Sequence, residues 1–259
     1  MKKLSVLFAA LAAFAFLGCS NSKKVNINGI SDLNGKKIGV QAGTTGETWV
    51  IDNIGNDNIS SFKTGIDAAL DLMNGAIDCV VLDELPAESI VSKNPSLKIV
   101  RCPEFAANKE EYAIAVKKGD TETLEIINAT ITDIKYDGFY EMLVNSFMPA
   151  DGKIVIPAFV SNGTKGVIKL GTNAAFPPFE YVEGKDFAGF DITMGEKIAA
   201  KAGARLEVID MAFDSLIPAL QAGTIDFIAA GMSVTEERKK NVDFSEPYFS
   251  SEQVIIVRK

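Results

Sequence analysis

The feature that most constrains the fold is a short internal repeat whose two copies lie 148 residues apart. One copy reads LMNGAIDCVVLD over residues 72–83, and the other reads LQAGTIDFIAAG over residues 220–231. Each copy predicts the end of a helix, a glycine stop, an Ile-Asp pair and a short apolar strand. Ligands of open α/β sheets bind at the carboxyl ends of strands, so Asp83 and Gly231 are expected at equivalent places.

Strand-like and helix-like segments alternate along the rest of the chain. For example, residues 36–40 have a strand pattern and are followed by a helix pattern that runs to residue 54. This alternation is typical of an α/β protein with parallel sheets. A chain of 259 residues with 47% hydrophobic residues can form one large domain or two lobes. The repeat favours two α/β lobes that face each other across a cleft, and chance recurrence of a short pattern is the alternative.

The first residues are a targeting segment. Two lysines follow Met1, and an apolar run over residues 4–17 is too short to span a bilayer, which predicts a signal peptide over residues 1–18. Residues 16–19, Phe-Leu-Gly-Cys, resemble a bacterial lipobox, in which Cys19 becomes the lipidated first residue. Residues 19–28 would then form a tether to the membrane of the cell envelope. The alternative is ordinary secretory cleavage that removes Cys19 or leaves it free.

Composition excludes several classes of function. A net charge of −8 argues against nucleic acid, whose binding proteins need a basic face. The chain has no histidine, which excludes histidine-based catalytic triads and histidine-ligated zinc. Three cysteines cannot form a disulfide framework, and whether Cys79 and Cys102 pair is left open.

The segment from Gly231 to Arg238 is the strongest candidate for binding chemistry. Thr235 suits a helix N-cap, which places Arg238 in the first helical turn behind the Ser233 hydroxyl. A guanidinium, a hydroxyl and a helix N-terminus together suit one carboxylate. The alternatives are a capping motif with Arg238 in a surface salt bridge, or a nucleophile elbow at Ser233, which lacks an obvious base.

Three further segments are candidates. Thr44 and Thr45 follow a predicted strand and could form a backbone N–H nest for the same anion, or a plain turn. Asp83 follows four apolar residues and needs a partner, either a ligand ammonium or a protein group. Phe176 lies on a stiff Phe-Pro-Pro-Phe loop, which could otherwise be an ordinary core loop.

Together these segments resemble the polar amino-acid-binding proteins of ABC importers. The pattern of the first lobe of that family is carried in order by residues 171–180, 189–191, 213–220, 231–238 and 243–248. The pattern of the second lobe comes first in this chain, in residues 32–40, 43–46, 83–84 and 137–140.

The resemblance implies a type II periplasmic-binding-protein fold that is circularly permuted, with the ligand cleft between two α/β lobes. The expected smaller lobe spans residues 29–111, and the larger lobe spans residues 118–253. Residues 112–117 and 254–259 are expected to be two hinge strands lying side by side. An atypical stretch over residues 149–165 would join the natural termini of the family.

The resemblance also implies roles for individual residues. Arg238 and Ser233 would bind the α-carboxylate of the ligand, with further contacts from Thr44 and Thr45. The Gly231 carbonyl and Asp83 would bind the α-ammonium. Other positions would surround the ligand side chain: Phe176 and Phe213 as a sandwich, Asn173 and Gln41 as readers of polarity, and Glu180 as a source of negative charge. The neutral amide of Asn173 favours a neutral polar amino acid, although Glu180 leaves lysine or arginine open.

The implied function is capture of one free L-amino acid by lobe closure, without a cofactor or a metal, and delivery to a separate ABC permease. The expected protein is a monomer held at the periplasmic or envelope face by its lipid. Two alternatives remain: a sensory ligand-binding lipoprotein, and a periplasmic dehydratase on the same fold, for which no second acid–base residue is evident.

Overall fold

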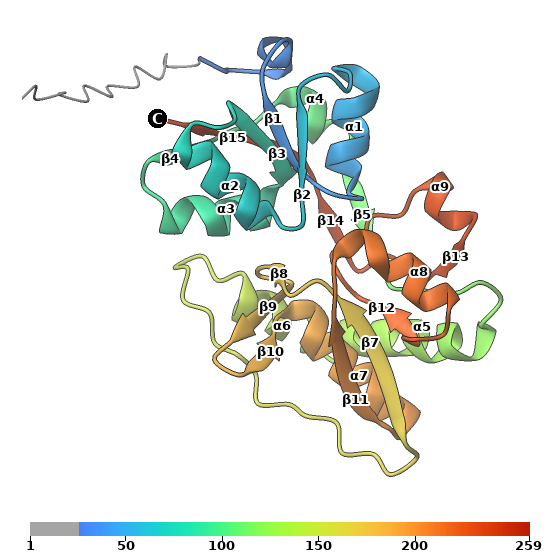
Figure 1. Cartoon of the computed structure of the whole chain (residues 1–259). Helices are drawn as coiled ribbons and strands as arrows, with labels where there is room; N and C mark the ends of the chain where they lie inside the picture. Colours follow the sequence, from blue (N-terminus) through green and yellow to red (C-terminus); the bar gives the residue numbers. More distant parts are fainter. Residues whose placement is uncertain (1–25) are drawn as a thin grey trace, which may run out of the picture.

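The computed structural model describes residues 26–259 (Figure 1). The predicted signal peptide, Cys19 and the first part of the predicted tether lie outside the described residues. None of the helices within residues 26–259 has the length and apolar character needed to cross a membrane.

The smaller lobe is a five-stranded sheet with the order β2-β1-β3-β15-β4, covered by helices on both faces (Figure 1). Strands β1, β2 and β3 are parallel, and β15 runs antiparallel between β3 and β4. Its elements are η1 (Ile30–Leu33), β1 (Ile38–Gln41), α1 (Thr45–Asn53), β2 (Ile59–Phe62), α2 (Gly65–Asn74), β3 (Cys79–Asp83), α3 (Glu84–Lys93), β4 (Leu97–Val100), α4 (Pro103–Ala106) and β15 (Gln253–Arg258).

The larger lobe contains a second five-stranded sheet with the order β11-β7-β12-β6-β13, and a small antiparallel sheet with the order β10-β9-β8. Its elements are β6 (Ala115–Lys117), α5 (Thr121–Tyr136), α6 (Phe139–Phe147), β7 (Val167–Thr172), β8 (Ala175–Phe176), β9 (Glu180–Glu183), β10 (Asp186–Ala188), α7 (Phe190–Ala202), β11 (Arg205–Asp210), η2 (Phe213–Ser215), α8 (Leu216–Gln221), β12 (Phe227–Ile228), α9 (Glu236–Lys239) and β13 (Val242–Phe244). The predicted two-lobe α/β architecture is confirmed.

The internal repeat has the same structural role in both lobes. In the smaller lobe, the Asp78 carboxylate accepts a hydrogen bond of 2.9 Å from the backbone N–H of Lys37, which leads into β1. In the larger lobe, the Asp226 carboxylate accepts one of 2.7 Å from the backbone N–H of Lys169 in β7. The aspartate of each copy therefore fixes the start of one central strand against the next.

The isoleucine of each copy packs over a glycine of the neighbouring central strand. A Cβ atom at Gly39 would lie 2.5 Å from Cδ1 of Ile77, and one at Gly171 would lie 2.2 Å from Cδ1 of Ile225. Neither position has room for a larger residue unless the isoleucine shifts. In both lobes, therefore, an isoleucine of the repeat packs over a glycine of the neighbouring strand, and the strands have the same order.

The chain crosses between the lobes at β5 (Glu110–Tyr112) and β14 (Phe249–Ser251), which pair antiparallel. The predicted hinge strands at residues 112–117 and 254–259 are wrong in position. Residues 115–117 belong to the large-lobe sheet, and β15 lies in the interior of the small-lobe sheet. The physical reason is the continuous apolar run of residues 254–257, which is fully buried and fits a central strand better than a solvated hinge.

The N-terminal boundary of the smaller lobe also differs from the prediction. The expected tether extends to Asn28, but Ile27 is 1% exposed and packs in the same apolar cluster as Ile255 and Val257. Cys79 and Cys102 are buried in that cluster as free thiols, which settles their pairing in this structure. Burial raises the pKa of Cys79 to about 12, as expected for an inert structural thiol.

Residues 149–165 are held along the surface of the larger lobe. The rings of Phe159 and Phe139 meet edge to face at 6.0 Å, and the Lys197 ammonium lies over both rings. The backbone N–H of Ser161 donates to Glu196, and the Ser161 hydroxyl accepts from the Leu206 N–H at 2.8 Å. These contacts fix the course of the connection from α6 to β7.

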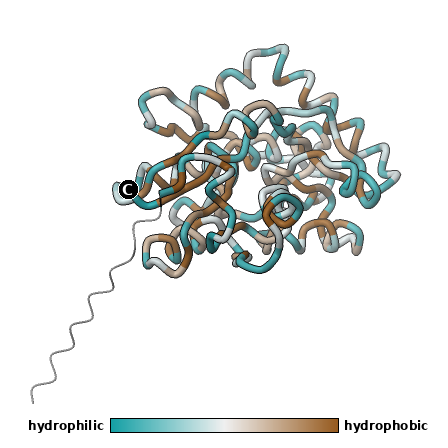
Figure 2. Tube along the Cα trace, turned by 90° about the horizontal axis from the view of Figure 1, so that it is seen from above, coloured by the Kyte–Doolittle hydropathy of each residue, from teal (hydrophilic) through white to brown (hydrophobic). Residues whose placement is uncertain are grey.

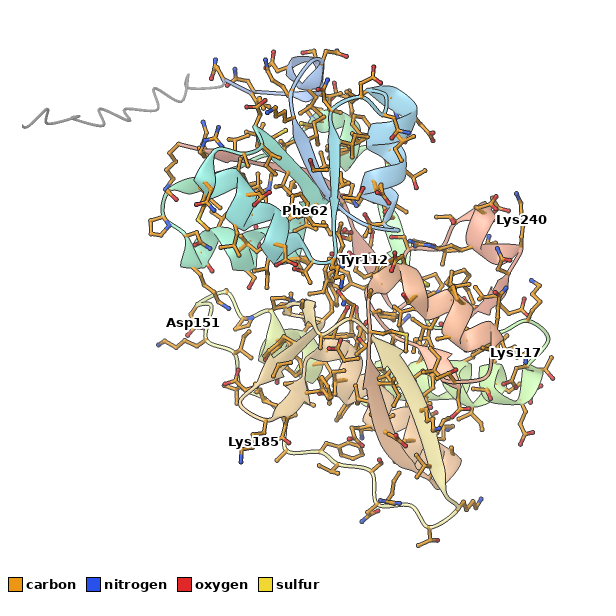
Figure 3. The ribbon with its side chains drawn as sticks, viewed as in Figure 1. Phe62, Tyr112, Lys117, Asp151, Lys185 and Lys240 are labelled. Atoms are coloured by element: carbon orange, nitrogen blue, oxygen red, sulfur yellow. The ribbon has the colours of Figure 1, made fainter. Side chains whose placement is uncertain are left out.

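The apolar core continues from one lobe into the other through the hinge. Figure 2 shows the apolar segments gathered inside the molecule and the hydrophilic segments outside. Tyr112 is fully buried between the lobes (Figure 3) and contacts the rings of Phe179, Tyr248 and Phe249. The connection between the lobes therefore consists of two paired strands and a cluster of packed aromatic rings.

Gly189 provides a test of the packing that positions the site. It has a φ of +133°, and a Cβ there would lie 2.0 Å from the Phe179 carbonyl oxygen. We expect Gly189→Ala to lower the free energy of unfolding by at least about 3 kcal/mol, because the backbone must move. Gly184→Ala is the control, because Gly184 has a φ of +65° but nothing within 4 Å of its added Cβ.

Chemical denaturation of the two variants and the parent measures the difference. Gly184→Ala should cost only about 1–2 kcal/mol, the strain of a left-handed residue. Equal losses in the two variants would contradict the close approach at Gly189.

Candidate functional site

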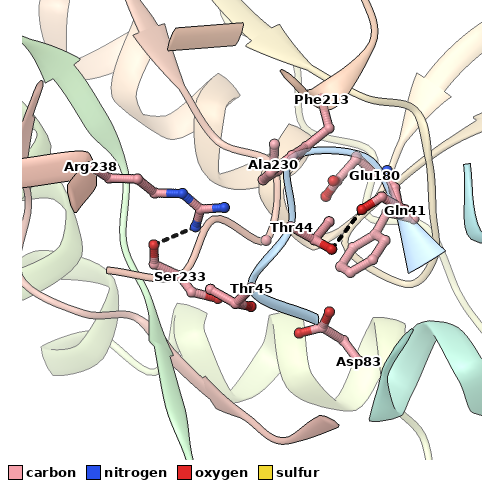
Figure 4. A pocket seen from close by; sticks show the side chains of 11 residues that line it. Gln41, Thr44, Thr45, Asp83, Glu180, Phe213, Ala230, Ser233 and Arg238 are labelled. Carbon is pink, nitrogen blue, oxygen red and sulfur yellow. Dashed lines mark hydrogen bonds between the residues drawn. The ribbon is translucent and has the colours of Figure 1, made fainter. Parts of the chain in front are cut away.

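The carboxyl ends of the central strands in both lobes face each other across one cavity. Gln41 and Asp83 end β1 and β3, and Gly231 comes three residues after β12. The cavity is small. Its lining comes from both lobes (Figure 4) and consists of Gln41, Thr44, Thr45, Asp83, Phe176, Glu180, Phe213, Ala230, Gly231, Ser233 and Arg238.

Ten of the eleven predicted ligand-binding residues are in this lining. The exception is Asn173, whose side-chain oxygen instead accepts a hydrogen bond of 3.0 Å from the Gln41 amide in the opposite lobe. Ala230 lines the cavity without having been predicted, because an alanine at a strand end carries no chemical signal.

Arg238 contacts both lobes. Its guanidinium donates to the Ser233 carbonyl at 2.6 Å and to the Gly43 carbonyl at 2.9 Å, and it lies 5.3 Å from the Phe213 ring centroid. The predicted Thr235 N-cap holds this segment, accepting from the Arg238 N–H at 3.1 Å. Burial lowers the pKa of Arg238 from its ordinary value.

The alternative of a surface salt bridge at Arg238 is not what the structure shows. Over residues 26–259, no carboxylate lies within ion-pair distance of its guanidinium, whereas its neighbours Lys239 and Lys240 both form such pairs. A half-buried guanidinium without a carboxylate partner has the capacity to bind an anionic ligand group.

The turn before α1 supplies hydrogen-bond donors from the smaller lobe. Thr44 is the N-cap of α1 and accepts from the backbone N–H of Glu47. Thr45 is the first helical residue, so its backbone N–H has no partner within the helix. The positive end of the helix dipole is therefore directed toward the cavity.

Asp83 is 4% exposed and accepts a hydrogen bond of 2.5 Å from the Tyr112 hydroxyl. Burial raises its pKa to about 7, and the nearby carboxylate of Glu110 contributes to this shift. The donors that the protein supplies to this carboxyl group are thus neutral ones, the Tyr112 hydroxyl first among them. A cation would be a stronger partner.

Glu180 is fully buried, and within the described residues neither of its carboxylate oxygens has a hydrogen-bond partner. Burial raises its pKa well above the ordinary value, and the carboxylates of Asp191 and Asp83 raise it further. An acidic group in such a place is costly to ionise unless a cation arrives. Glu180 reaches the cavity from β9 of the larger lobe, beside the aromatic ring of Phe176.

Asp191 is a site residue that was not predicted as one. It is fully buried, and one of its oxygens accepts from the Gly231 N–H at 2.9 Å and from the Tyr248 hydroxyl at 2.7 Å. It therefore fixes the peptide whose carbonyl was predicted to bind an ammonium. The available signal was an aspartate directly after Gly189-Phe190, in a segment that carries the family resemblance.

The nucleophile-elbow alternative for Ser233 does not fit the local geometry. Ser233 forms an isolated bridge with Tyr112, and the next helix, α9, begins only at Glu236. Its hydroxyl donates to the Glu110 carboxylate. An elbow requires a sharp turn from a strand directly into a helix.

The buried acids make stability depend on pH. Burial raises the pKa of Asp191 to about 7, so the folded state holds protons that the unfolded chain has released between about pH 4 and pH 7. We expect the free energy of unfolding to fall as the pH rises through this window. Asp191→Asn should flatten the slope by up to about 1.4 kcal/mol per pH unit.

Denaturant titrations at a series of pH values measure this slope, with the exposed Asp186→Asn as control. If Asp191→Asn and Asp186→Asn have the same slope, Asp191 is not protonated in the folded state.

Comparison with known proteins finds a similarity in the C-terminal part of the chain. Residues 168–259 match the bacterial extracellular solute-binding proteins, family 3. An arginine-binding extracellular protein of Bacillus subtilis is 45% identical over 98 residues, which is 38% of each chain. A probable histidine-binding protein of Campylobacter jejuni is 40% identical over 92 residues, or 36% of each chain.

An ABC transporter arginine-binding protein of Escherichia coli is 34% identical over 113 residues, which is 41% of this chain and 46% of the relative. The chain thus spans less than half the length of these relatives. The matched segment contains seven lining residues of the cavity, from Phe176 to Arg238. The similarity of this chain to the bacterial extracellular solute-binding proteins, family 3, thus lies in residues 168–259.

Proposed function

We propose that this protein captures one L-amino acid with a cationic side chain, arginine first among them, between its lobes. It then delivers the amino acid to an ABC importer at the cell envelope. The observation that carries the proposal is the buried carboxyl group of Glu180, which has no partner among the described residues and opens on the cavity. A ligand cation would supply the missing partner.

The two groups that all free amino acids share have complementary partners in the cavity. Arg238, with the backbone N–H groups of Thr45 and Ser233, suits an α-carboxylate. Asp83 and the Gly231 carbonyl suit an α-ammonium. Opposite charges at two places in the cavity would orient the ligand and direct its side chain toward Glu180.

This proposal replaces the expectation of a neutral polar ligand. That expectation rested on the amide of Asn173, but Asn173 is engaged by Gln41 and lies outside the cavity lining. Glu180 is the charged group that remains for the ligand side chain, and the unpaired side-chain oxygen of Gln41 is a further acceptor in the lining. The names of the relatives agree, since two are arginine-binding and one is a probable histidine-binding protein.

Lobe closure would provide the selectivity. Arg238 from the larger lobe reaches the Gly43 carbonyl of the smaller lobe, and Gln41 of the smaller lobe reaches Asn173 of the larger. Residues on both sides can contact one ligand only when the lobes approach, so binding favours the closed conformation. An importer that recognises the closed form would then receive loaded protein.

Lipid attachment through Cys19 and a monomeric state belong to the same proposal. The sensory alternative uses the same cleft and differs only in the partner that reads the closed form. The dehydratase alternative requires an acid–base pair at the ligand. Asp83 and Glu180 are the two carboxyl groups in the lining, so product analysis after incubation with dehydratable substrates separates this alternative from binding.

A thermal-shift screen of the twenty amino acids tests the ligand class. Partial unfolding and refolding should come first, to remove any ligand that accompanies the protein. A ligand at 100 times its Kd adds about 2.7 kcal/mol to the apparent stability. We expect arginine, and next lysine, to raise the Tm most; a shift confined to neutral amino acids would contradict the cationic assignment.

Glu180→Gln is the sharpest variant, because it keeps the shape of the side chain and removes its charge. We expect it to lose about 2–5 kcal/mol of arginine binding in calorimetry, with little effect on glutamine binding. Glu183→Gln, at the exposed end of the same strand, is the matched control. Equal arginine affinity in the two variants would remove Glu180 from the site.

The proposed circular permutation has its own test. The match to the family lies at residues 168–259, after segments that resemble its second lobe. Ile27 and Val257 share one apolar cluster, so the described ends can be joined by a short linker. A rearranged chain, residues 167–259 followed by residues 27–148, should fold and bind the same amino acid within about threefold in Kd.

Loss of binding in a folded rearranged chain would contradict the permutation. Circular dichroism on the same sample decides whether that chain is folded.

A further inference from the structure

Glu110 lies on the hinge strand β5 and connects the two lobes through a single carboxylate oxygen. That oxygen, Oε2, accepts from the Thr45 hydroxyl of the smaller lobe at 2.6 Å and from the Ser233 hydroxyl of the larger lobe. The other oxygen, Oε1, accepts from the Gln253 amide at 3.3 Å. Glu110 is therefore bonded to one element of each lobe and to the first residue of β15.

The two hydroxyl groups that Glu110 engages are those predicted to contact the ligand carboxylate. A serine or threonine hydroxyl has one hydrogen to donate. While Ser233 and Thr45 donate to Glu110, neither hydroxyl can donate to a ligand. The Glu110 carboxylate therefore already accepts from two hydroxyl groups that a ligand carboxylate would need as donors.

Glu110 also shares the electrostatic environment of the cavity. It does not line the cavity itself, but it lines the wider groove on the other side of Thr45 and Arg238. Its carboxylate raises the pKa of Arg238 against the effect of burial, and it raises the pKa of Asp83. The negative charge of Glu110 would therefore repel a ligand carboxylate bound at Arg238.

We propose that Glu110 is a specificity-determining residue, a resident carboxylate that competes with the α-carboxylate of the ligand for the Ser233 and Thr45 hydroxyl groups. The inference rests on the proposed function and adds a residue to it. Glu110 weakens the binding of ligands with a free carboxylate relative to ligands in which that group is neutral. It also joins the lobes, because its two hydroxyl donors come from opposite sides of the cleft.

The test compares L-arginine with L-argininamide, which differ only at the carboxyl group. In the parent protein, the amide of argininamide can donate to Glu110, whereas the carboxylate of arginine is repelled by it. Glu110→Gln removes the charge and keeps the shape. We expect this variant to raise the ratio of the argininamide Kd to the arginine Kd by about tenfold, the order for loss of one like charge near the surface.

Glu111→Gln is the matched control, because Glu111 is the next residue on β5 and its side chain is exposed. Isothermal titration calorimetry measures arginine directly and argininamide by displacement. A general loss of packing at the hinge would lower both affinities together and leave their ratio unchanged. Glu110→Ala should change the ratio in the same direction, and it replaces the glutamine variant if that variant fails to fold.

The outcomes separate the two proposals. If the parent protein binds no amino acid, the proposed function fails and this inference fails with it. If the screen identifies a neutral ligand, that ligand and its amide replace the arginine pair. If the parent binds but the Glu110 variants give the same Kd ratio as Glu111→Gln, the competition is overturned and the proposed function stands.

Discussion

Two sheets whose strand ends face each other concentrate buried charge in a small space, and the rest of the structure accommodates that charge. Asp83, Glu180 and Asp191 are all nearly or fully buried, and Arg238 is the cation among the residues around the cavity. Moving a charge out of water costs several kcal/mol unless it is paired. The protein resolves this cost only in part: Asp191 receives an N–H and a hydroxyl, Asp83 receives a tyrosine hydroxyl, and Glu180 receives nothing from the described residues. A ligand of opposite charge can offset the desolvation cost that the protein's own donors leave uncompensated.

Much of this arrangement could be predicted because it depends on local sequence. The repeated Ile-Asp-strand pattern indicated two similar lobes, and strand ends in α/β sheets identify where a site forms. The Thr235 cap and the position of Arg238 follow from spacing within one turn of helix. The residues predicted from these patterns meet around one cavity, with Asn173 as the exception.

The parts that were not predicted depend on contacts between distant segments. Three-residue strands such as β5 and β14 carry too little periodicity to reveal that they pair. The apolar run of β15 looks like any buried strand, and only its neighbours β3 and β4 show that it belongs to the smaller lobe. Glu110 has no local signature either, because its importance comes from Thr45 and Ser233, which lie 65 and 123 residues away in sequence.

The hydrogen bond between Gln41 and Asn173 joins positions that correspond in the two lobes. The two residues are 132 apart in sequence, the same offset that relates the strand starts anchored by Asp78 and Asp226. Contact between corresponding positions is typical of two units related by an approximate two-fold axis, as in an isologous dimer interface. In this respect the lobes resemble a covalently linked dimer. A symmetric cavity would accept a small ligand in two opposite orientations with equal ease. The difference between Asp83 and Gly231, at matching strand ends, breaks that equivalence and leaves one orientation favoured.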